Sequence, residues 1–210
     1  MEILQKILDK LPSLFYNVRF RKIGTIGEYH MKIEIMANEN EIREAFAQKF
    51  LLTWEEFQIE YRDFLDRIRE KNHEFHFENA LMWDKMPKTY QTPTFSEALN
   101  LLKRLQGEVY FIAEPGETLR INKKTYPNFV AKANATALAD LIENDWYASW
   151  KAENYLYLEI LPPDLYVFDA EMKHMLVFTH ENDLWESELT EPMKSAAARV
   201  CLAYGFTQET

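Results

Sequence analysis

Apolar and polar residues alternate along several short segments of the chain. This period of two predicts β-strands that each place one face on a core. Residues 18–20 and 29–35 lie on either side of Gly24 and Gly27, so they predict a hairpin with one solvated face. The segment "EVYFIAEPGETLRIN" predicts a second hairpin that turns at Pro115–Gly116, and "NFVAKA" predicts a further short strand.

Other segments repeat apolar residues every three or four positions, which predicts amphipathic helices. These segments are residues 2–11, 39–71, 95–105 and 134–150. Within the second of them, apolar and mostly aromatic positions recur from Trp54 to Ile68, which predicts one helical stripe about four turns long.

Two of the predicted helix starts carry a capping box, in which a threonine and a glutamate three residues later each bind the other's free main-chain N–H. The pairs are Thr53 with Glu56 and Thr94 with Glu97. They fix where the two helices begin.

The last third of the chain has the clearest β-pattern. The segments "DLYVFD" and "HMLVFTH" are apolar on both faces and are joined by the polar "AEMK", which predicts a hairpin inside a sheet that is covered on both sides. Before them, "YLYLEIL" predicts a strand that ends at Pro162–Pro163, because proline cannot donate to a β-ladder. After them, Pro192 and Gly205 bracket "EPMKSAAARVCLAYG", which predicts a terminal helix.

Together these elements predict an α+β fold in which helices pack around a mixed or antiparallel β-sheet. The 210 residues are 47% hydrophobic and 14% aromatic, which is enough to bury a core without disulfides or metals. No internal repeat, low-complexity tract or flexible linker divides the sequence, so we expect a single compact domain over residues 1–210. The irregular segment 84–94 is the weak candidate for a sub-boundary.

The charge balance limits the partners of the protein. Acidic residues outnumber basic ones by 34 to 24, which gives a net charge of −10. Such a surface repels nucleic-acid phosphates, and two short basic clusters at residues 19–22 and 123–124 are too small to reverse the repulsion, so we expect no general nucleic-acid binding. A basic protein partner is favoured instead, because opposite charge accelerates encounter. Solubility alone is the other explanation of the negative charge.

Nothing in the sequence predicts a membrane protein. No segment reaches the roughly 20 apolar residues of a membrane-spanning helix, and residues 2–11 carry charges unlike those of a signal peptide. The single cysteine, Cys201, excludes an internal disulfide and suits a reducing compartment. We therefore expect a cytoplasmic protein.

The strand end "THEND" is the first candidate site. His180, Glu181 and Asp183 offer one ring nitrogen and two carboxylates, which are ligands that suit zinc or a non-haem metal. Asp169 and His174 lie at the other end of the hairpin and are too far away to complete the set. The alternative is that these residues only end the strand and turn the chain. We expect no cofactor, with a divalent metal as the alternative.

The segment "IENDWYASW" is the second candidate site. It places Glu143, Asp145, Trp146, Tyr147 and Trp150 on neighbouring turns of a predicted helix. Aromatic faces and carboxylates together can bind a cationic peptide or ligand. The alternative is that the two tryptophans belong to the apolar stripe that faces the core, with the acids in solvent.

Other catalytic signatures are missing. His73 and His76 are three residues apart, whereas the HExxH zinc motif needs four. The sequence has no GxSxG, no P-loop and no GxGxxG motif. Cys201 lies in an apolar segment and looks like a small core residue rather than a nucleophile.

The segment "LPPDLYVFDAEMKHMLVFTHE", residues 161–181, resembles a hairpin of small uncharacterised bacterial domains. In that hairpin a tyrosine-bearing strand, a short acidic turn and a strand ending in "THE" recur. Some of these domains look like immunity proteins, which neutralise bacterial toxins. The present chain departs from the pattern at His174–Met175, where a tryptophan is expected. The resemblance implies an intracellular domain and transfers no functional residue.

Two functions are consistent with these observations. The first is a non-enzymatic protein-binding module of immunity or adaptor type, which the acidic charge, the aromatic content and the missing catalytic motifs favour. The second is a metal-dependent hydrolase that uses a His180/Glu181 centre with ligands from another element.

Overall fold

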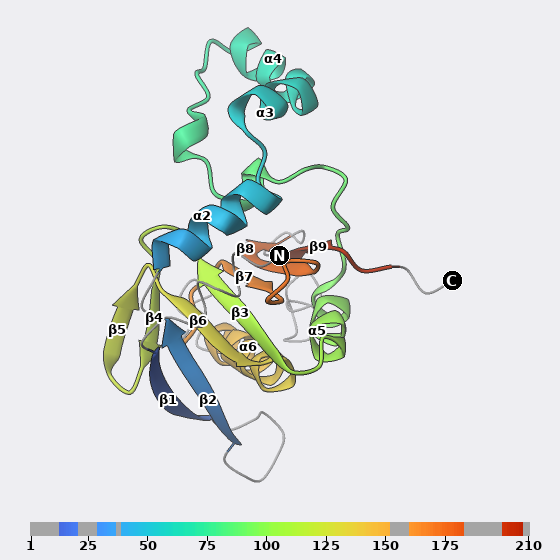
Figure 1. Ribbon diagram of the computed structural model, residues 1–210. Coiled ribbons are helices and arrows are strands. Elements are labelled where there is room, and N and C mark those ends of the chain that lie inside the picture. Colours follow the sequence, from blue (N-terminus) through green and yellow to red (C-terminus); the bar gives the residue numbers. More distant parts are fainter. Residues whose placement is uncertain (1–12, 21–28, 37–38, 152–159, 183–198, 208–210) are drawn as a thin grey trace.

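The computed structural model describes residues 13–20, 29–36, 39–151, 160–182 and 199–207 (Figure 1). Seven strands form one sheet in the order β1-β2-β6-β3-β7-β8-β9, and two more form a separate hairpin, β4-β5. Every pairing is antiparallel. The strands are β1 (Ser13–Phe20), β2 (Tyr29–Met36), β3 (Glu108–Ala113), β4 (Thr118–Ile121), β5 (Lys124–Pro127), β6 (Val130–Asn134), β7 (Leu165–Phe168), β8 (Met175–Asn182) and β9 (Arg199–Tyr204).

The helices lie between these strands in the chain. They are α2 (Glu39–Phe50), α3 (Trp54–Glu60), α4 (Arg62–Glu70), α5 (Phe95–Arg104) and α6 (Ala135–Lys151), with two short 3-10 helices, η1 (Phe77–Asn79) and η2 (Trp83–Lys85). Among the helices that the structure describes, none combines the length and the apolar character that crossing a membrane requires.

The large sheet is covered on both faces, with α2 on one side and α5 and α6 on the other (Figure 1). The alternation along β3 shows the division. Val109 and Phe111 belong to the core beneath α5 and α6, whereas Tyr110 and Ile112 belong to the core beneath α2. The β4-β5 hairpin adds Leu119 to the first core. The molecule is therefore a three-layer α+β structure, and the predicted α+β fold class is confirmed.

The β7-β8 hairpin lies inside the sheet, between β3 and β9, as the apolar character of both its faces predicts. The predicted pairing around residues 21–28 is also present, as β1 with β2. Both predicted capping boxes form, at Thr53 and at Thr94. The predicted helix at residues 2–11 and most of the predicted strand at residues 155–161 lie outside the described residues.

The predicted hairpin at Pro115–Gly116 is wrong. Strand β3 pairs with β6 and β7, and among the described strands β4 pairs with β5 alone. The tight turn lies instead at Asn122 and Lys123, with φ of 51° and 64°. Two successive positive φ values are typical of the type I′ turn, whose twist matches that of paired strands. The usual sequence of this turn is Asn-Gly, so Asn122–Lys123 is only a weak indication of a hairpin in the sequence.

The predicted terminal helix is also wrong where the structure describes it, because Arg199–Tyr204 is the edge strand β9. It pairs with β8, and its outer edge forms an isolated bridge between Ala203 and Gln91. Cys201 and Ala203 alternate into the α5–α6 core, and Cys201 is 1% exposed. Completing the sheet beside β8 outweighs the helix propensity of the preceding alanines.

The single helical stripe predicted from Trp54 to Ile68 is broken at Tyr61, which separates α3 from α4. The Tyr61 hydroxyl donates to the main-chain oxygen of Met86, at 2.7 Å. The ammonium of Lys88 donates to the main-chain oxygen of Glu60, at 2.8 Å. That oxygen would accept the N–H of Phe64 in a continuous helix, but this N–H donates to Tyr61 instead. Contacts with distant residues therefore set the break.

Candidate functional site

His180 stands near the end of β8, beside Asp164, which immediately precedes β7. The main-chain N–H of His180 donates to Oδ1 of Asp164 at 2.8 Å, and ring Nδ1 lies 2.9 Å from Oδ2. The Asp164 side chain is 3% exposed and the His180 side chain is 29% exposed. A buried carboxylate thus orients the imidazole, an arrangement also found for histidines that bind metals or move protons.

Two more acids lie next to this pair, on the segment that follows β3. The Tyr166 hydroxyl and the main-chain N–H of Met82 both donate to Oε1 of Glu114. The Tyr166 oxygen in turn accepts the main-chain N–H of Trp83, at 3.1 Å. We name this group the Glu114 cluster; it contains Glu114, Glu117, Asp164, Tyr166 and His180.

Burial and nearby negative charges raise the pKa of two acids in the Glu114 cluster, Glu114 and Glu117. Burial raises the pKa of Glu114, although hydrogen bonds from Tyr166 and Met82 oppose the shift. Burial, and then the charges of Asp164 and Glu114, raise the pKa of Glu117 to about 8. Burial and the neighbouring Glu114 likewise raise the pKa of Tyr166 well above its ordinary value. The Glu114 cluster therefore holds a proton at neutral pH.

Most polar atoms of the Glu114 cluster are engaged in holding the chain together. Through Met82 and Trp83, the cluster ties the η2 segment to the ends of β3 and β7. Among the described residues, one buried atom of the cluster, Oε2 of Glu117, and one buried atom next to it, Nε1 of Trp83, lack a hydrogen-bond partner. The Trp83 ring also makes an edge contact with His180, with 6.4 Å between ring centres. The Glu114 cluster thus fastens the η2 segment to the large sheet.

The predicted metal centre is not assembled by the described residues. Within them, no group of three His, Cys, Asp or Glu side chains is placed to hold a metal ion. His180 is paired with Asp164, whereas the Glu181 side chain and all of Asp183 lie outside the described part of the chain. Because two of its three ligands lie outside the described residues, the metal centre stays a prediction, and we derive no catalytic step through a metal.

The predicted binding surface on α6 is only partly described. Asp145 is 2% exposed, and its Oδ2 accepts the main-chain N–H groups of Ile160 and Leu161, at 3.1 and 2.8 Å. This carboxylate therefore holds the chain beside α6 rather than facing a partner. Glu143 is half-buried. The side chains of Trp146, Tyr147 and Trp150 lie outside the described part, and their predicted role stays a prediction.

A second region of interest is the α3–α4 lobe, residues 53–79, which lies beyond α2 at the end of the molecule remote from β1 and β2 (Figure 1). The lobe has an aromatic core of its own. Phe57 is 1% exposed and stacks on Tyr61 and on Phe75, with ring centres 4.4 and 5.3 Å apart. Phe77 and Trp54 pack around the same ring. Aromatic packing thus holds the lobe together outside the two sheet cores.

The outer side of the α3–α4 lobe is hollowed into a groove of about 500 Å³ between the two helices. Ile59 lies on this groove and is 71% exposed; it is the one large apolar side chain exposed among the described residues. Charged side chains of both signs flank it. We name this surface the Ile59 groove; it is lined by Glu55, Gln58, Ile59, Arg62, Leu65, Asp66 and Arg69.

A separate pocket of about 380 Å³ opens on another side of the α3–α4 lobe. Aromatic rings of α3, α4 and the following loop form its walls, and charged residues stand at its rim. We name it the Phe64 pocket; it is lined by Phe57, Tyr61, Asp63, Phe64, Arg67, Phe75, Asp84 and Lys88.

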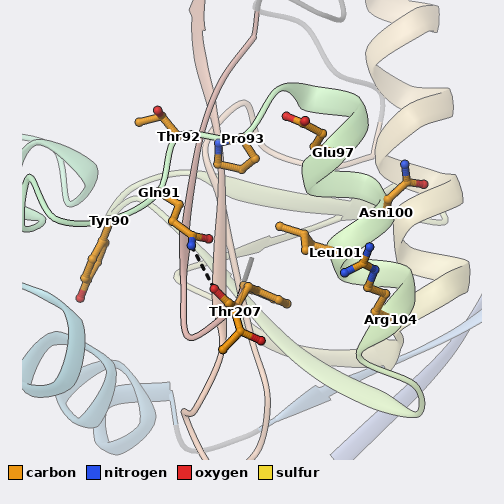
Figure 2. A pocket seen from close by; sticks show the side chains of 10 residues that line it. Tyr90, Gln91, Thr92, Pro93, Glu97, Asn100, Leu101, Arg104 and Thr207 are labelled. Atoms are coloured by element: carbon orange, nitrogen blue, oxygen red, sulfur yellow. Dashed lines mark hydrogen bonds between the residues drawn. The ribbon is translucent and has the colours of Figure 1, made fainter. Parts of the chain in front are cut away.

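An open cleft of about 740 Å³ lies between α5, residues 90–93 and the chain after β9 (Figure 2). Leu101 and Arg104 project from α5 into its neighbourhood, and Gln91 stands on the opposite side. Two of its polar side chains have structural tasks. Gln91 Nε2 donates to the main-chain oxygen of Phe206 at 3.0 Å, and Glu97 closes the capping box of α5. Because these side chains stabilise the fold, we do not propose the cleft as a binding site.

Comparisons with protein-family models, with curated proteins and with solved structures found no match.

Sequence reasoning selected His180 but missed the residues around it. Glu114 follows β3, whereas Asp164 and Tyr166 lie at the start of β7, and the order β3-β7-β8 brings both strand ends beside His180. The one available signal was an acid directly after an apolar strand, at Glu114, and directly before another, at Asp164. Ile59 was missed because a continuous helix would have carried it on an ordinary solvated face.

Proposed function

We propose that this protein is a non-enzymatic protein-binding module and that the Ile59 groove on the α3–α4 lobe is its recognition surface. The observation that carries the proposal is the 71% exposure of Ile59 inside a groove formed by two helices. A groove between helices with an apolar floor and charged sides is one of the recurring ways in which proteins bind an amphipathic helix. Leu65, which is 5% exposed, is the second apolar residue that lines the groove.

The occupant that fits best is a helix of another protein that is basic overall. The net charge of −10 attracts such a partner over long distances and accelerates encounter. Charges at the groove then set orientation and register. Glu55 provides a carboxylate on α3, whereas Arg69 already pairs with Asp66 on α4 at 3.2 Å. Arg62 adds a positive charge on α4, so a helix with apolar residues on one side and flanking charges of both signs matches this pattern.

The immunity-protein character that the hairpin at residues 161–181 resembles agrees with this function, because immunity proteins act by binding. We also propose a reducing, cytoplasmic setting. The lone cysteine, Cys201, is buried as a free thiol in β9, which suits such a compartment.

The experiment is a quantitative pull-down from the native host with wild-type protein and with Ile59→Glu, followed by mass spectrometry and by titration of the purified partner. The partner would bury Ile59 in the complex. Replacing it with a charged residue should weaken the affinity at least tenfold, which corresponds to about 1.4 kcal/mol of binding free energy. Ile59→Leu should retain binding, because it preserves apolar area.

Thr125→Glu on β5 is the matched control, since it adds the same charge at an exposed position outside the lobe. Equal loss of affinity in both glutamate variants would indicate a general charge effect and would refute the role of the groove. Unchanged affinity of Ile59→Glu would refute it as well.

The second candidate is the metal-dependent hydrolase with a His180/Glu181 centre. The specific observation in its favour is the orientation of His180 by the buried carboxylate of Asp164. Elemental analysis of wild-type protein and His180→Ala tests it directly. Stoichiometric metal that is lost in the variant would support this candidate, and metal-free wild-type protein after purification without chelators would end it.

A further inference from the structure

We propose that the Phe64 pocket binds a free α-amino acid with a large apolar side chain, such as phenylalanine. This site goes beyond the proposed protein-binding function and does not rest on it. The walls would receive the side chain, and two charged residues of α4, Asp63 and Arg67, would receive the ammonium and the carboxylate.

The walls of the Phe64 pocket are aromatic and held in place. Phe64 and Phe75 meet edge to face, with ring centres 5.5 Å apart and an angle of 84° between the rings. Phe57 lies parallel to Phe75, at an angle of 4°. The Tyr61 ring is fixed at its hydroxyl by Met86. Because Phe57 is 1% exposed between its two stacked neighbours, the half-buried rings of Phe64 and Phe75 offer the accessible apolar wall. Rings held in place bind an apolar group with little loss of conformational freedom.

The rim carries one available charge of each sign. Asp63 and Arg67 are one helical turn apart on α4, where such residues are neighbours. Nε of Arg67 donates to the main-chain oxygen of Asp63 at 3.2 Å rather than to its carboxylate. Within the part of the chain that the structure describes, the terminal nitrogens of Arg67 and the carboxylate of Asp63 have no hydrogen-bond partner.

The other two charges at the rim are already engaged. The Lys88 ammonium donates to the main-chain oxygen of Glu60 and lies 4.4 Å above the centre of the Tyr61 ring. Asp84 has interactions of its own. A ligand therefore meets Arg67 and Asp63 as its charged partners. A guanidinium binds a carboxylate through two parallel hydrogen bonds, and a carboxylate binds an ammonium, so the complementary ligand is zwitterionic.

The volume agrees with this ligand. Pockets for small molecules span roughly 300 to 1,000 Å³, and the Phe64 pocket, at about 380 Å³, lies at the small end of that range. An amino acid with one large side chain fits within such a space.

The test is calorimetric titration of the full chain with L-phenylalanine and three analogues. N-acetyl-L-phenylalanine lacks the ammonium, L-phenylalaninamide lacks the carboxylate, and L-alanine lacks the ring. Each analogue should bind roughly tenfold more weakly or worse, because each loses a charge-assisted hydrogen bond or the apolar contact. In Arg67→Gln, the affinity for phenylalanine should fall by the same factor, while the affinity for L-phenylalaninamide should not change. In Asp63→Asn, the affinity for phenylalanine should fall, while the affinity for N-acetyl-L-phenylalanine should not change.

Arg69→Gln is the matched control, because Arg69 is exposed on the same helix and lines the Ile59 groove instead of the Phe64 pocket. It should bind phenylalanine as wild-type protein does, and so should Ile59→Glu, which separates this site from the proposed function. Equal affinity for all ring-bearing probes, or no binding of phenylalanine, would overturn the proposal. Tighter binding of the N-acetyl compound or of the amide would overturn it in favour of a peptide C-terminus or N-terminus.

Discussion

The buried carboxylate of Asp164 holds His180 twice, through its main-chain N–H at 2.8 Å and through its ring at 2.9 Å. This pair joins the start of β7 to the end of β8, where the register of β8 with β9 shifts between Phe178 and Asn182. The pair therefore fastens a strand end that regular β-pairing does not hold.

Asp164→Asn should break this relationship in a measurable way. The amide oxygen can still accept the main-chain N–H, but the amide nitrogen can only donate to the ring. We expect His180 to change tautomer, which ring-nitrogen NMR shifts report, and the free energy of unfolding to fall by about 1 to 3 kcal/mol. An unchanged tautomer with unchanged stability would show that Asp164 does not orient the ring.

The stability of the protein should fall as pH rises, because of Glu117. Its pKa is about 8 in the folded protein, against an ordinary value of 4.5. Between these values the folded state binds more protons than the unfolded state, so the free energy of unfolding decreases from about pH 4.5 to about pH 8. Burial raises the pKa of Glu114 too, which adds a contribution of the same sign.

Glu117→Gln isolates this contribution, because the amide stays neutral at every pH. Urea unfolding at a series of pH values should show the variant to be as stable as wild-type protein near pH 4 and more stable near pH 8. Asp164→Asn should lower the pKa of Glu117, since the Asp164 charge helps to raise it. Parallel pH profiles for wild-type protein and Glu117→Gln would contradict the raised pKa.

Two glycines provide a matched pair that tests the packing of the chain end after β9. Gly205 has φ of 85°, and a Cβ there would lie 1.9 Å from the main-chain oxygen of Lys173. Gly107 has φ of 99°, and a Cβ there would meet nothing within 4 Å. Gly107→Ala should therefore cost only the backbone strain, about 1 to 2 kcal/mol. Gly205→Ala should cost clearly more, and equal losses in chemical denaturation would show that the contact with Lys173 is not tight.

The sequence predicted best those features that local pattern determines. Both capping boxes depend on residues three apart, and both form as predicted. The interior position of β7 and β8 followed from their apolar character on both faces. These features need no knowledge of what lies elsewhere in the chain.

Features that depend on distant contacts were not predictable in the same way. β9 is a strand because the edge of β8 needs a partner, although the segment before it is rich in alanine. The break at Tyr61 depends on Met86 and Lys88, and that break shapes the groove on which Ile59 stands. The Glu114 cluster likewise needs the strand order before its acids can meet.

Hydrogen–deuterium exchange of the protein alone and bound to its purified partner tests the central claim most directly, because it shows which surface the partner covers. We expect slower exchange in α3 and α4, residues 54–70, and no change in the β4-β5 hairpin. Protection confined to α6 or to the cleft beside α5, with residues 54–70 unaffected, would contradict recognition through the Ile59 groove.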